Sequence, residues 1–224
     1  MGFDFNKTNA TEVSPGVADD PTFLAFGPKN ANGGMGAIFQ FDSRDIAANA
    51  WKGVYLNAQA LFYGSYLGSD NEYQAYDLDY RQYAGLGRKG RTLAWTVRGR
   101  LTNGNVPWAE LPQLGSSSDL RGYRQGRYRD KTITYGILEY RHQFTSKRRK
   151  SGLSRHGFVL WAGAGSLAPT PAEIQHWLPN WGVGYRLEVQ PRMSVRADIG
   201  FGKEFYSHGN EFQPSVYFNF TEAF

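Results

Sequence analysis

The segment Trp181-Gly182-Val183-Gly184-Tyr185-Arg186-Leu187-Glu188-Val189-Gln190 alternates apolar residues with glycines or polar residues along its whole length. A period of two is typical of a β-strand with one apolar and one polar face. After a tight turn between Gln190 and Met193, the alternation resumes over residues 194–201. The two segments together predict an antiparallel hairpin, and they indicate an all-β chain.

The same alternation recurs on both sides of this hairpin. It covers residues 35–44, 54–62, 76–81, 92–101 and 215–224, and it is less regular over 131–144 and 158–167. Phe3 and Phe5, on either side of Asp4, predict one more short strand near the start. Counted from the alternation, we therefore expect about ten strands, with eight as the alternative.

The polar faces of these strands decide between a soluble and a membrane protein. They carry glycines and oppositely charged neighbours: Asp42 with Arg44, Asp77 and Asp79 with Arg81, Arg186 with Glu188, and Arg196 with Asp198. The outer face of a soluble sandwich is instead mostly polar residues exposed to water. A charge facing lipid costs about 2–4 kcal/mol at the membrane midplane, so the apolar faces should point outward. The pattern favours an antiparallel transmembrane β-barrel over a soluble all-β domain.

The connections between the predicted strands fall into two classes. Residues 45–52 and 85–91 are short, whereas 9–32, 103–130, 167–180 and 203–213 are longer and rich in Gly, Pro, Ser and Asn. Transmembrane barrels have short periplasmic turns and longer extracellular loops. The basic segment 145–157 is a long turn on the predicted periplasmic side. We interpret it as a solvated turn, with a contact to anionic headgroups or to a partner as the alternative.

Composition excludes several other classes of protein. The chain of 224 residues has no break in composition, so we expect a single domain, and it has no run of 18 apolar residues that could form a transmembrane helix. It has no cysteine, and its four histidines lack metal-ligand spacing, so we expect no metal and no other cofactor. The net charge of +5 is spread over strands and turns, which argues against a nucleic-acid partner.

One long connection has an unusual composition. The run Leu120-Arg121-Gly122-Tyr123-Arg124-Gln125-Gly126-Arg127-Tyr128-Arg129-Asp130 holds four arginines and two tyrosines. It resembles the sixth extracellular loop, with its Arg-Gly-aromatic tip, of the BamA/TamA (bacterial surface antigen) outer-membrane barrels. Three other motifs resemble that family in the same order: Asp42-Ser43-Arg44-Asp45, the Glu-Tyr-Arg of residues 136–141, and the terminal strand Phe218–Phe224.

The resemblance covers residues 33–224 and corresponds to the C-terminal barrel half, without periplasmic polypeptide-transport-associated domains. Within the single domain 1–224, we distinguish a short first strand with a long outer loop (1–32), the Arg-Gly-Tyr loop (104–130) and the terminal strand (214–224). It implies a bacterial outer-membrane protein that resembles the membrane part of the protein insertion and translocation machinery. Such a protein would act through a weak lateral seam between its first and last strands, without a chemical step, and would not be an enzyme.

The resemblance also implies partners, namely outer-membrane lipid and lipopolysaccharide, unfolded outer-membrane protein clients, and a second copy of the chain. Two alternatives belong to other classes. One is a structural barrel or small pore that self-associates. The other is an outer-membrane lipid-modifying enzyme, for which Ser207 and His208 in an outer loop are the candidate residues.

In the family, the loop arginine folds toward the inner barrel wall and pairs with acidic residues there. If the resemblance extends to this contact, Arg121 pairs with Glu139. The alternative is that Arg121 only holds the loop over the mouth of the barrel. The candidates for this loop lock are Arg121, Gly122, Tyr123, Asp130, Glu139 and Arg141. Phe218, Phe220 and Phe224 are the candidates for a terminal assembly signal, and the alternation places them on one outward face.

Two features of this chain depart from the family pattern. Where relatives often carry a second acid in a Phe-Asp-Ala-Gly-like segment, this chain reads Leu160-Trp161-Ala162-Gly163. A barrel of eight to ten strands is also nearly filled by its own side chains. Arg121 is therefore expected to descend less deeply than in relatives of about sixteen strands, unless two copies join or the barrel stays open.

Overall fold

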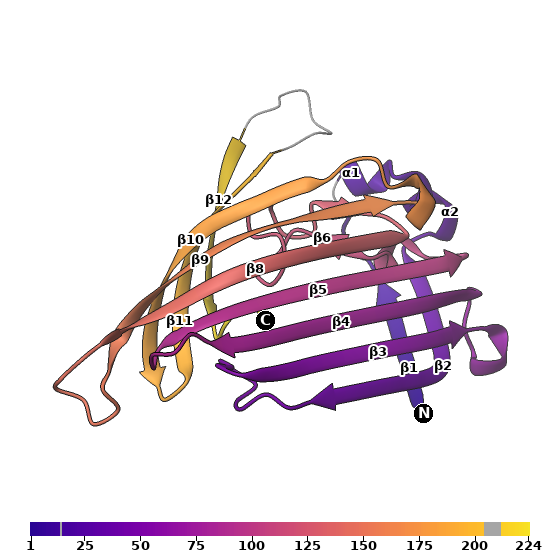
Figure 1. Ribbon diagram of the computed structural model, residues 1–224. Helices are drawn as coiled ribbons and strands as arrows, with labels where there is room; N and C mark the ends of the chain where they lie inside the picture. Colours follow the sequence, from indigo (N-terminus) through magenta and orange to yellow (C-terminus); the bar gives the residue numbers. More distant parts are fainter. Residues whose placement is uncertain (14, 204–211) are drawn as a thin grey trace.

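The computed structural model describes residues 1–13, 15–203 and 212–224, and its main feature is one curved antiparallel sheet (Figure 1). Each strand pairs with its neighbours along the chain, in the order β1-β2-β3-β4-β5-β8-β9-β10-β11-β12. The strands are β1 (Gly2–Asn9), β2 (Lys29–Asp42), β3 (Gly53–Tyr63), β4 (Tyr73–Gly85), β5 (Arg91–Gly104), β8 (Thr132–Thr145), β9 (Leu153–Ala168), β10 (Leu178–Gln190), β11 (Met193–Lys203) and β12 (Phe212–Phe220). The predicted all-β class and the strand number of about ten are confirmed.

The remaining elements lie in the connections. They are α1 (Pro15–Ala18), α2 (Pro21–Phe26), β6 (Gln113–Leu114), β7 (Tyr128–Arg129), and the 3-10 turns η1 (Ser65–Leu67), η2 (Trp108–Glu110) and η3 (Pro171–Glu173). The sequence pattern does not predict the two short helices. Asp20 begins α2, because its Oδ1 accepts hydrogen bonds from the main-chain N–H groups of Thr22 (2.8 Å) and Phe23 (3.2 Å). No helix in the described part of the chain is long and apolar enough to cross a membrane.

The two faces of the sheet differ as the alternation predicts. Large apolar side chains at mid-strand positions of the outer face are between 43% and 57% exposed, namely Leu78, Val97, Leu138, Leu160, Val183, Ile199 and Val216. The intervening positions point to the concave side and are buried, among them Asp79, Thr96, Glu139 and Asp198. The apolar face is therefore the outer one, as expected for a sheet surrounded by lipid.

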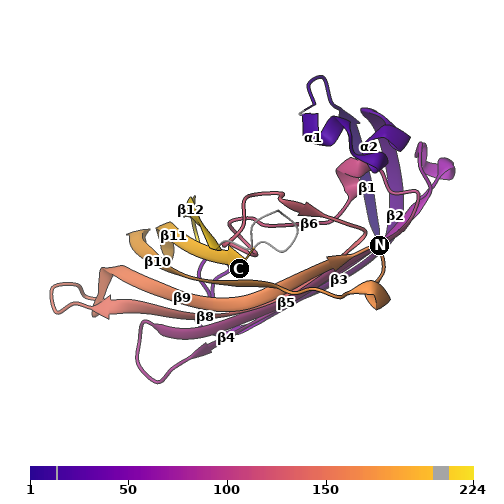
Figure 2. The same cartoon turned by 90° about the horizontal axis from the view of Figure 1, so that it is seen from above.

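The connections sort to opposite ends of the sheet. Residues 43–52, 86–90, 146–152 and 191–192 connect the strands at one end, which we call the turn end. Residues 10–28, 64–72, 105–131 and 169–177 lie at the other, the loop end. Connection 105–131 folds back over the concave face of the sheet (Figure 2). Short turns on one side and long loops on the other are the arrangement of outer-membrane barrels.

The two edges of the sheet do not pair with each other within the described residues. Strand β1 covers only residues 29–36 of β2, so Ala37–Asp42 have β3 on one side and no described strand on the other. Side chains join the two edge regions at the turn end instead. Arg192 donates to Asp45 Oδ2 (2.9 Å) and to the main-chain oxygen of Asn49, and its guanidinium lies 3.8 Å from the Trp51 ring centroid. The β2–β3 turn and the β10–β11 turn are thus tied to each other across the opening at the turn end.

Candidate functional site

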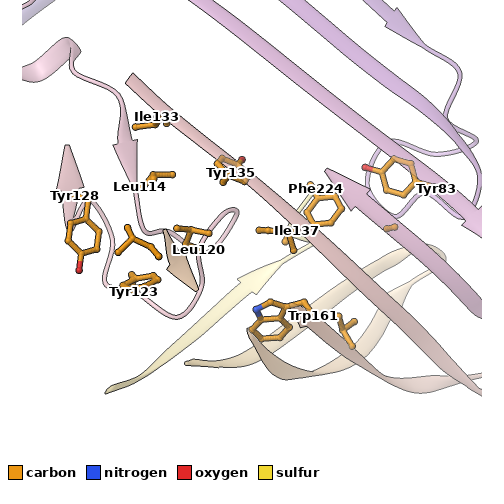
Figure 3. Close-up of a cluster of buried hydrophobic side chains, with 14 of the residues drawn as sticks. Tyr83, Leu114, Leu120, Tyr123, Tyr128, Ile133, Tyr135, Ile137, Trp161 and Phe224 are labelled. Carbon is orange, nitrogen blue, oxygen red and sulfur yellow. The ribbon is translucent and has the colours of Figure 1, made fainter. Parts of the chain in front are cut away.

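The loop between β5 and β8 brings its tip to the inner wall of the sheet. Strands β6 and β7 pair with each other in this loop. The turn before the tip is shaped by Asp119, whose carboxylate accepts hydrogen bonds from Gly115 N (3.0 Å) and Ser116 Oγ (2.8 Å). Burial raises the pKa of Asp119, although these hydrogen bonds act in the opposite direction. The apolar side chains of the loop, Leu114, Leu120, Tyr123 and Tyr128, pack with residues of the sheet (Figure 3).

Arg121 is completely buried at the end of this loop. Its Nη2 donates to Glu139 Oε2 (2.5 Å) on β8, and its Nη1 donates to Asp198 Oδ2 (3.1 Å) on β11. Its guanidinium carbon lies 3.7 Å from the ring centroid of Trp161 on β9, a cation–π contact. A buried guanidinium without such partners would cost several kcal/mol. The structure therefore brings Arg121 and Glu139 together, as the family resemblance implies, and adds a second acid.

The ion pairs of Arg121 belong to a larger network, which we call the charge cluster. Asp198 also accepts from Arg186 Nη1 (2.5 Å) and Arg196 Nη1 (3.0 Å). Glu139 also accepts from Arg141 Nε (2.6 Å), and Glu222 accepts from Arg186 Nε (2.8 Å). The cluster holds four guanidiniums and three carboxylates, those of Arg121, Arg141, Arg186, Arg196, Glu139, Asp198 and Glu222. It joins the loop to β8, β10, β11 and the segment after β12.

The loop tip lies against strand β11 at two glycines. The Gly122 N–H donates to Asn180 Oδ1 (2.7 Å) on β10, and a Cβ on Gly122 would lie 2.4 Å from the carbonyl carbon of Phe201. A Cβ on Gly200 would lie 2.3 Å from the Arg121 oxygen, and one on Gly202 would lie 2.5 Å from Tyr123 Cζ. Real Cβ atoms do not approach so closely, so this contact requires glycines on both sides.

Tyr123 fixes the tip from the loop end. Its hydroxyl donates to the main-chain oxygen of Pro179 (2.8 Å) and accepts from the Lys203 N–H (3.1 Å). The Tyr217 hydroxyl donates to the main-chain oxygen of Tyr123. The tip therefore connects β10, β11 and β12, the last strands before the seam.

The segment after β12 also enters the concave side. Strand β12 ends at Phe220, and Thr221 has a left-handed backbone with φ 66°. Phe224 is 7% exposed and packs against Tyr83, with ring centroids 6.5 Å apart, and its main-chain oxygen accepts from Arg141 Nη2 (2.9 Å). The expectation that Phe224 shares the outward face of Phe218 and Phe220 is wrong. Phe218 and Phe220 are 76% and 65% exposed, whereas the turn at Thr221 directs Phe224 inward, and β12 ends four residues before the predicted terminal strand does.

Among the predicted loop-lock residues, the structure brings together Arg121, Gly122, Tyr123, Glu139 and Arg141. Asp130 lies apart from them at the loop end, where it accepts from the Lys131 N–H (2.7 Å) and where burial raises the pKa of its carboxyl. In the part of the chain that the structure describes, no group of three His, Asp or Glu side chains is placed to hold a metal ion.

Sequence reasoning missed the second acid. The strand after β8 has none, and Asp198, two strands further along the sheet, supplies it. The alternation placed Arg196 and Asp198 on the inner face, but it could not show that they meet the loop. The expectation of a shallower Arg121 carries an exception for joined copies or an open barrel. The described sheet is open between β1 and β12, one of the two conditions under which deeper insertion was expected, and the apolar loop fills its concave side.

Replacing Arg121 by alanine is expected to release the loop while the sheet remains folded. The change leaves Glu139 and Asp198 without one of their guanidiniums, and removing one partner of a buried ion pair costs about 3–5 kcal/mol. Limited proteolysis in detergent micelles should therefore cut residues 113–130 faster than in the unchanged protein. Arg124→Ala, at an exposed arginine of the same loop, is the control and should leave the cleavage rate unchanged. Equal cleavage of both variants would contradict a holding role for Arg121.

A comparison with protein families accounts for the order of these elements. A model of the Omp85 superfamily domain matches residues 28–224, a region that contains β2 to β12 and the whole charge cluster. The search of the curated proteins finds no match. Members of the superfamily are bacterial outer-membrane proteins without enzymatic activity. The chain therefore belongs to the Omp85 superfamily, whose members are outer-membrane barrels of the protein insertion and translocation type.

Proposed function

We propose that this protein promotes the insertion or passage of other outer-membrane proteins at the seam between β1 and β12. The observation that carries the proposal is the pair of sheet edges without a described partner strand. Each unpaired backbone N–H or C=O group in hydrocarbon costs several kcal/mol. Such an edge is a template for an incoming strand, which would gain hydrogen bonds that neither lipid nor the protein supplies.

The pairing between β1 and β2 is weak enough for an incoming strand to pair temporarily at this edge of the sheet. Gly33, Gly34 and Gly36 of β2 lie opposite β1, and glycine weakens a strand because it has no side chain to pack. Beyond Gly36, the side chains of Ala37–Asp42 are exposed. The ties of Arg192 at the turn end would keep the two edges near each other while the rest of the seam opens. This mechanism involves no chemical step. Ser207 and His208, on which the lipid-modifying alternative depends, lie outside the described residues.

The proposal predicts that the protein accelerates the folding of another barrel. A urea-unfolded small outer-membrane barrel is diluted into liposomes with or without the reconstituted protein, and folding is followed by the gel shift of the heat-modifiable form. We expect faster folding in the presence of the protein, because the seam offers the first strand pairing. No acceleration above lipid alone would favour the structural barrel or small pore.

A cross-link across the seam tests the site of action. Because the chain has no cysteine, single cysteines can be placed in β1 and in β12 without competing thiols. Because β1 and β12 are not neighbours in the described sheet, the pair is bridged by a bismaleimide that contains a disulfide. The bridge should abolish the acceleration, and reduction of the linker should restore it. A matched pair at Ala58 and Leu78, which face each other on β3 and β4, should leave it unchanged. Bridges between two chains, seen as dimers on a non-reducing gel, would instead identify a second copy as the occupant of the seam.

A further inference from the structure

The positive charge of this protein is concentrated at one side of the turn end. The β4–β5 and β8–β9 connections, with the residues next to them, form what we call the basic rim: Arg88, Lys89, Arg91, Lys147, Arg148, Arg149, Lys150 and Arg155. These are eight of the 25 Lys and Arg residues, and the segments 86–91 and 145–157 contain no Asp or Glu. The rest of the chain has 17 basic residues (25 less 8) and 20 acidic ones, a net charge of −3. The basic rim thus accounts for the whole positive net charge.

The two turns of the basic rim lie side by side. Strands β5 and β8 are neighbours in the sheet, and the Gln143 N–H donates to the Gly90 oxygen (2.7 Å). Figures 1 and 2 show both turns at the same end, with the β8–β9 turn extending beyond the other strands. Six of the cations are exposed, namely Arg88, Lys89, Lys147, Arg148, Lys150 and Arg155. Among the described residues, the only ion pair of the basic rim is that of Arg149 with Glu188 (3.0 Å).

An aromatic patch on the outer face of the sheet borders the basic rim directly. It consists of Tyr140, His142 and Phe144 on β8 and Phe158 on β9. The ring centroids of His142 and Phe158 are 5.2 Å apart, and those of Phe144 and Phe158 are 5.8 Å apart. Arg91 of the basic rim lies opposite His142 in the strand register. Aromatic side chains at the ends of barrel strands mark the boundary between hydrocarbon and headgroups.

We propose that the basic rim and its aromatic patch bind anionic phospholipid of the leaflet at the turn end. The acyl chains would lie along the aromatic patch, and the headgroup phosphate would meet the cations just beyond it. Each Lys or Arg near an anionic membrane surface strengthens attraction by about fivefold. The inference is independent of the seam, because β4, β5, β8 and β9 lie in the middle of the sheet.

The geometry favours a lipid over an acidic protein as the ligand. A site for a soluble acidic partner needs only exposed charge. Here the cations lie at the ends of the same strands that carry the lipid-facing aromatic patch. Opposite charges are also present at other turns. In the β2–β3 turn Arg44 pairs with Asp42 and Asp45 pairs with Arg192, so attraction for an anion is weakened there.

The test compares phosphatidylglycerol with phosphatidylcholine on the full chain. The protein is purified in a neutral detergent, each lipid is added separately, and the bound lipids are counted by native mass spectrometry. We expect phosphatidylglycerol to be retained at least about tenfold more than phosphatidylcholine, a preference that falls with rising salt. At matched ionic strength, inorganic phosphate should displace no more lipid than chloride does if headgroup and acyl chain are both recognised. Greater displacement by phosphate than by chloride would show a site for free anions and overturn the proposal.

A matched pair of variants locates the site. The triple change Lys147→Gln, Lys150→Gln and Arg148→Gln should reduce phosphatidylglycerol retention to the level of phosphatidylcholine. The control removes three exposed cations from the loop-end half of the molecule, by Lys7→Gln, Lys29→Gln and Arg124→Gln, and should keep the preference. Both variants are first checked for the heat-modifiable folded form. Equal retention of the two lipids by the unchanged protein, or equal loss in both triple variants, would overturn the proposal. So would a preference for phosphatidylglycerol that survives the rim variant.

Discussion

Replacing Asp198 by alanine is expected to destabilise this protein more than any other removal of a carboxylate. Asp198 is completely buried and accepts from Arg121, Arg186 and Arg196, so the change leaves three guanidiniums without their shared partner. Breaking a buried ion pair in this way costs about 3–5 kcal/mol. The free energy of unfolding, measured by urea titration in lipid vesicles, should fall by that amount at an unchanged slope. The loop should become sensitive to protease in the same variant.

Asp42 provides the matched control for this change. It also pairs with an arginine on its own chain segment, Arg44 (2.8 Å), but its side chain is 32% exposed. Such a pair contributes about 0–1 kcal/mol, because water screens the charges. Asp42→Ala should therefore lower the free energy of unfolding by no more than about 1 kcal/mol. The isosteric change Asp198→Asn removes the charge but keeps the shape of the side chain. It should lower the free energy of unfolding nearly as much as Asp198→Ala does. A loss for Asp198→Ala no larger than that for Asp42→Ala would show that the charge cluster does not hold the loop.

The sequence predicts the strands of this protein better than it predicts the site. Alternation identifies the outer face because lipid imposes the same apolar requirement at every second position, and Val183 and Ile199 obey it independently of their partners. The loop is different, because Arg121 meets Asp198, which lies 77 positions further along the chain, only after the strands between them have been placed. Residues 158–167 show how a distant contact obscures the local pattern. Their alternation is blurred because Val159 and Trp161 are apolar yet point inward, where Trp161 faces a guanidinium supplied by the loop.

The terminal segment is a second case in which distant contacts decide the local structure. A continued alternation through Phe224 predicts an unbroken strand, although it would place Glu222 on the apolar outer face together with Phe220 and Phe224. The inward turn depends on distant residues, since Glu222 pairs with Arg186 and Phe224 with Arg141. A local pattern reports the surroundings of a strand, whereas the ends of a strand depend on tertiary contacts.

Replacing Gly200 by alanine is expected to displace the Arg121 loop without changing any charged residue. The new Cβ would lie 2.3 Å from the main-chain oxygen of Arg121, a backbone atom that cannot move by rotating a side chain. Overpacking of this kind costs about 1–3 kcal/mol, and the strand cannot yield because β10 and β12 pair with it on both sides. The loop should move instead, and faster proteolysis of residues 113–130 should report it.

Gly136 on β8 is the control for this substitution, because a Cβ there finds its nearest neighbour at 3.7 Å, an ordinary contact. Gly136→Ala should leave stability and cleavage unchanged. A double-mutant cycle then identifies the route of the effect. If Gly200→Ala acts by lifting the loop, it has already broken the ion pairs of Arg121, and adding Arg121→Ala should cost less than the sum of the two changes. Strict additivity would mean that Gly200→Ala acts elsewhere in β11, and that the glycine contact does not position the arginine.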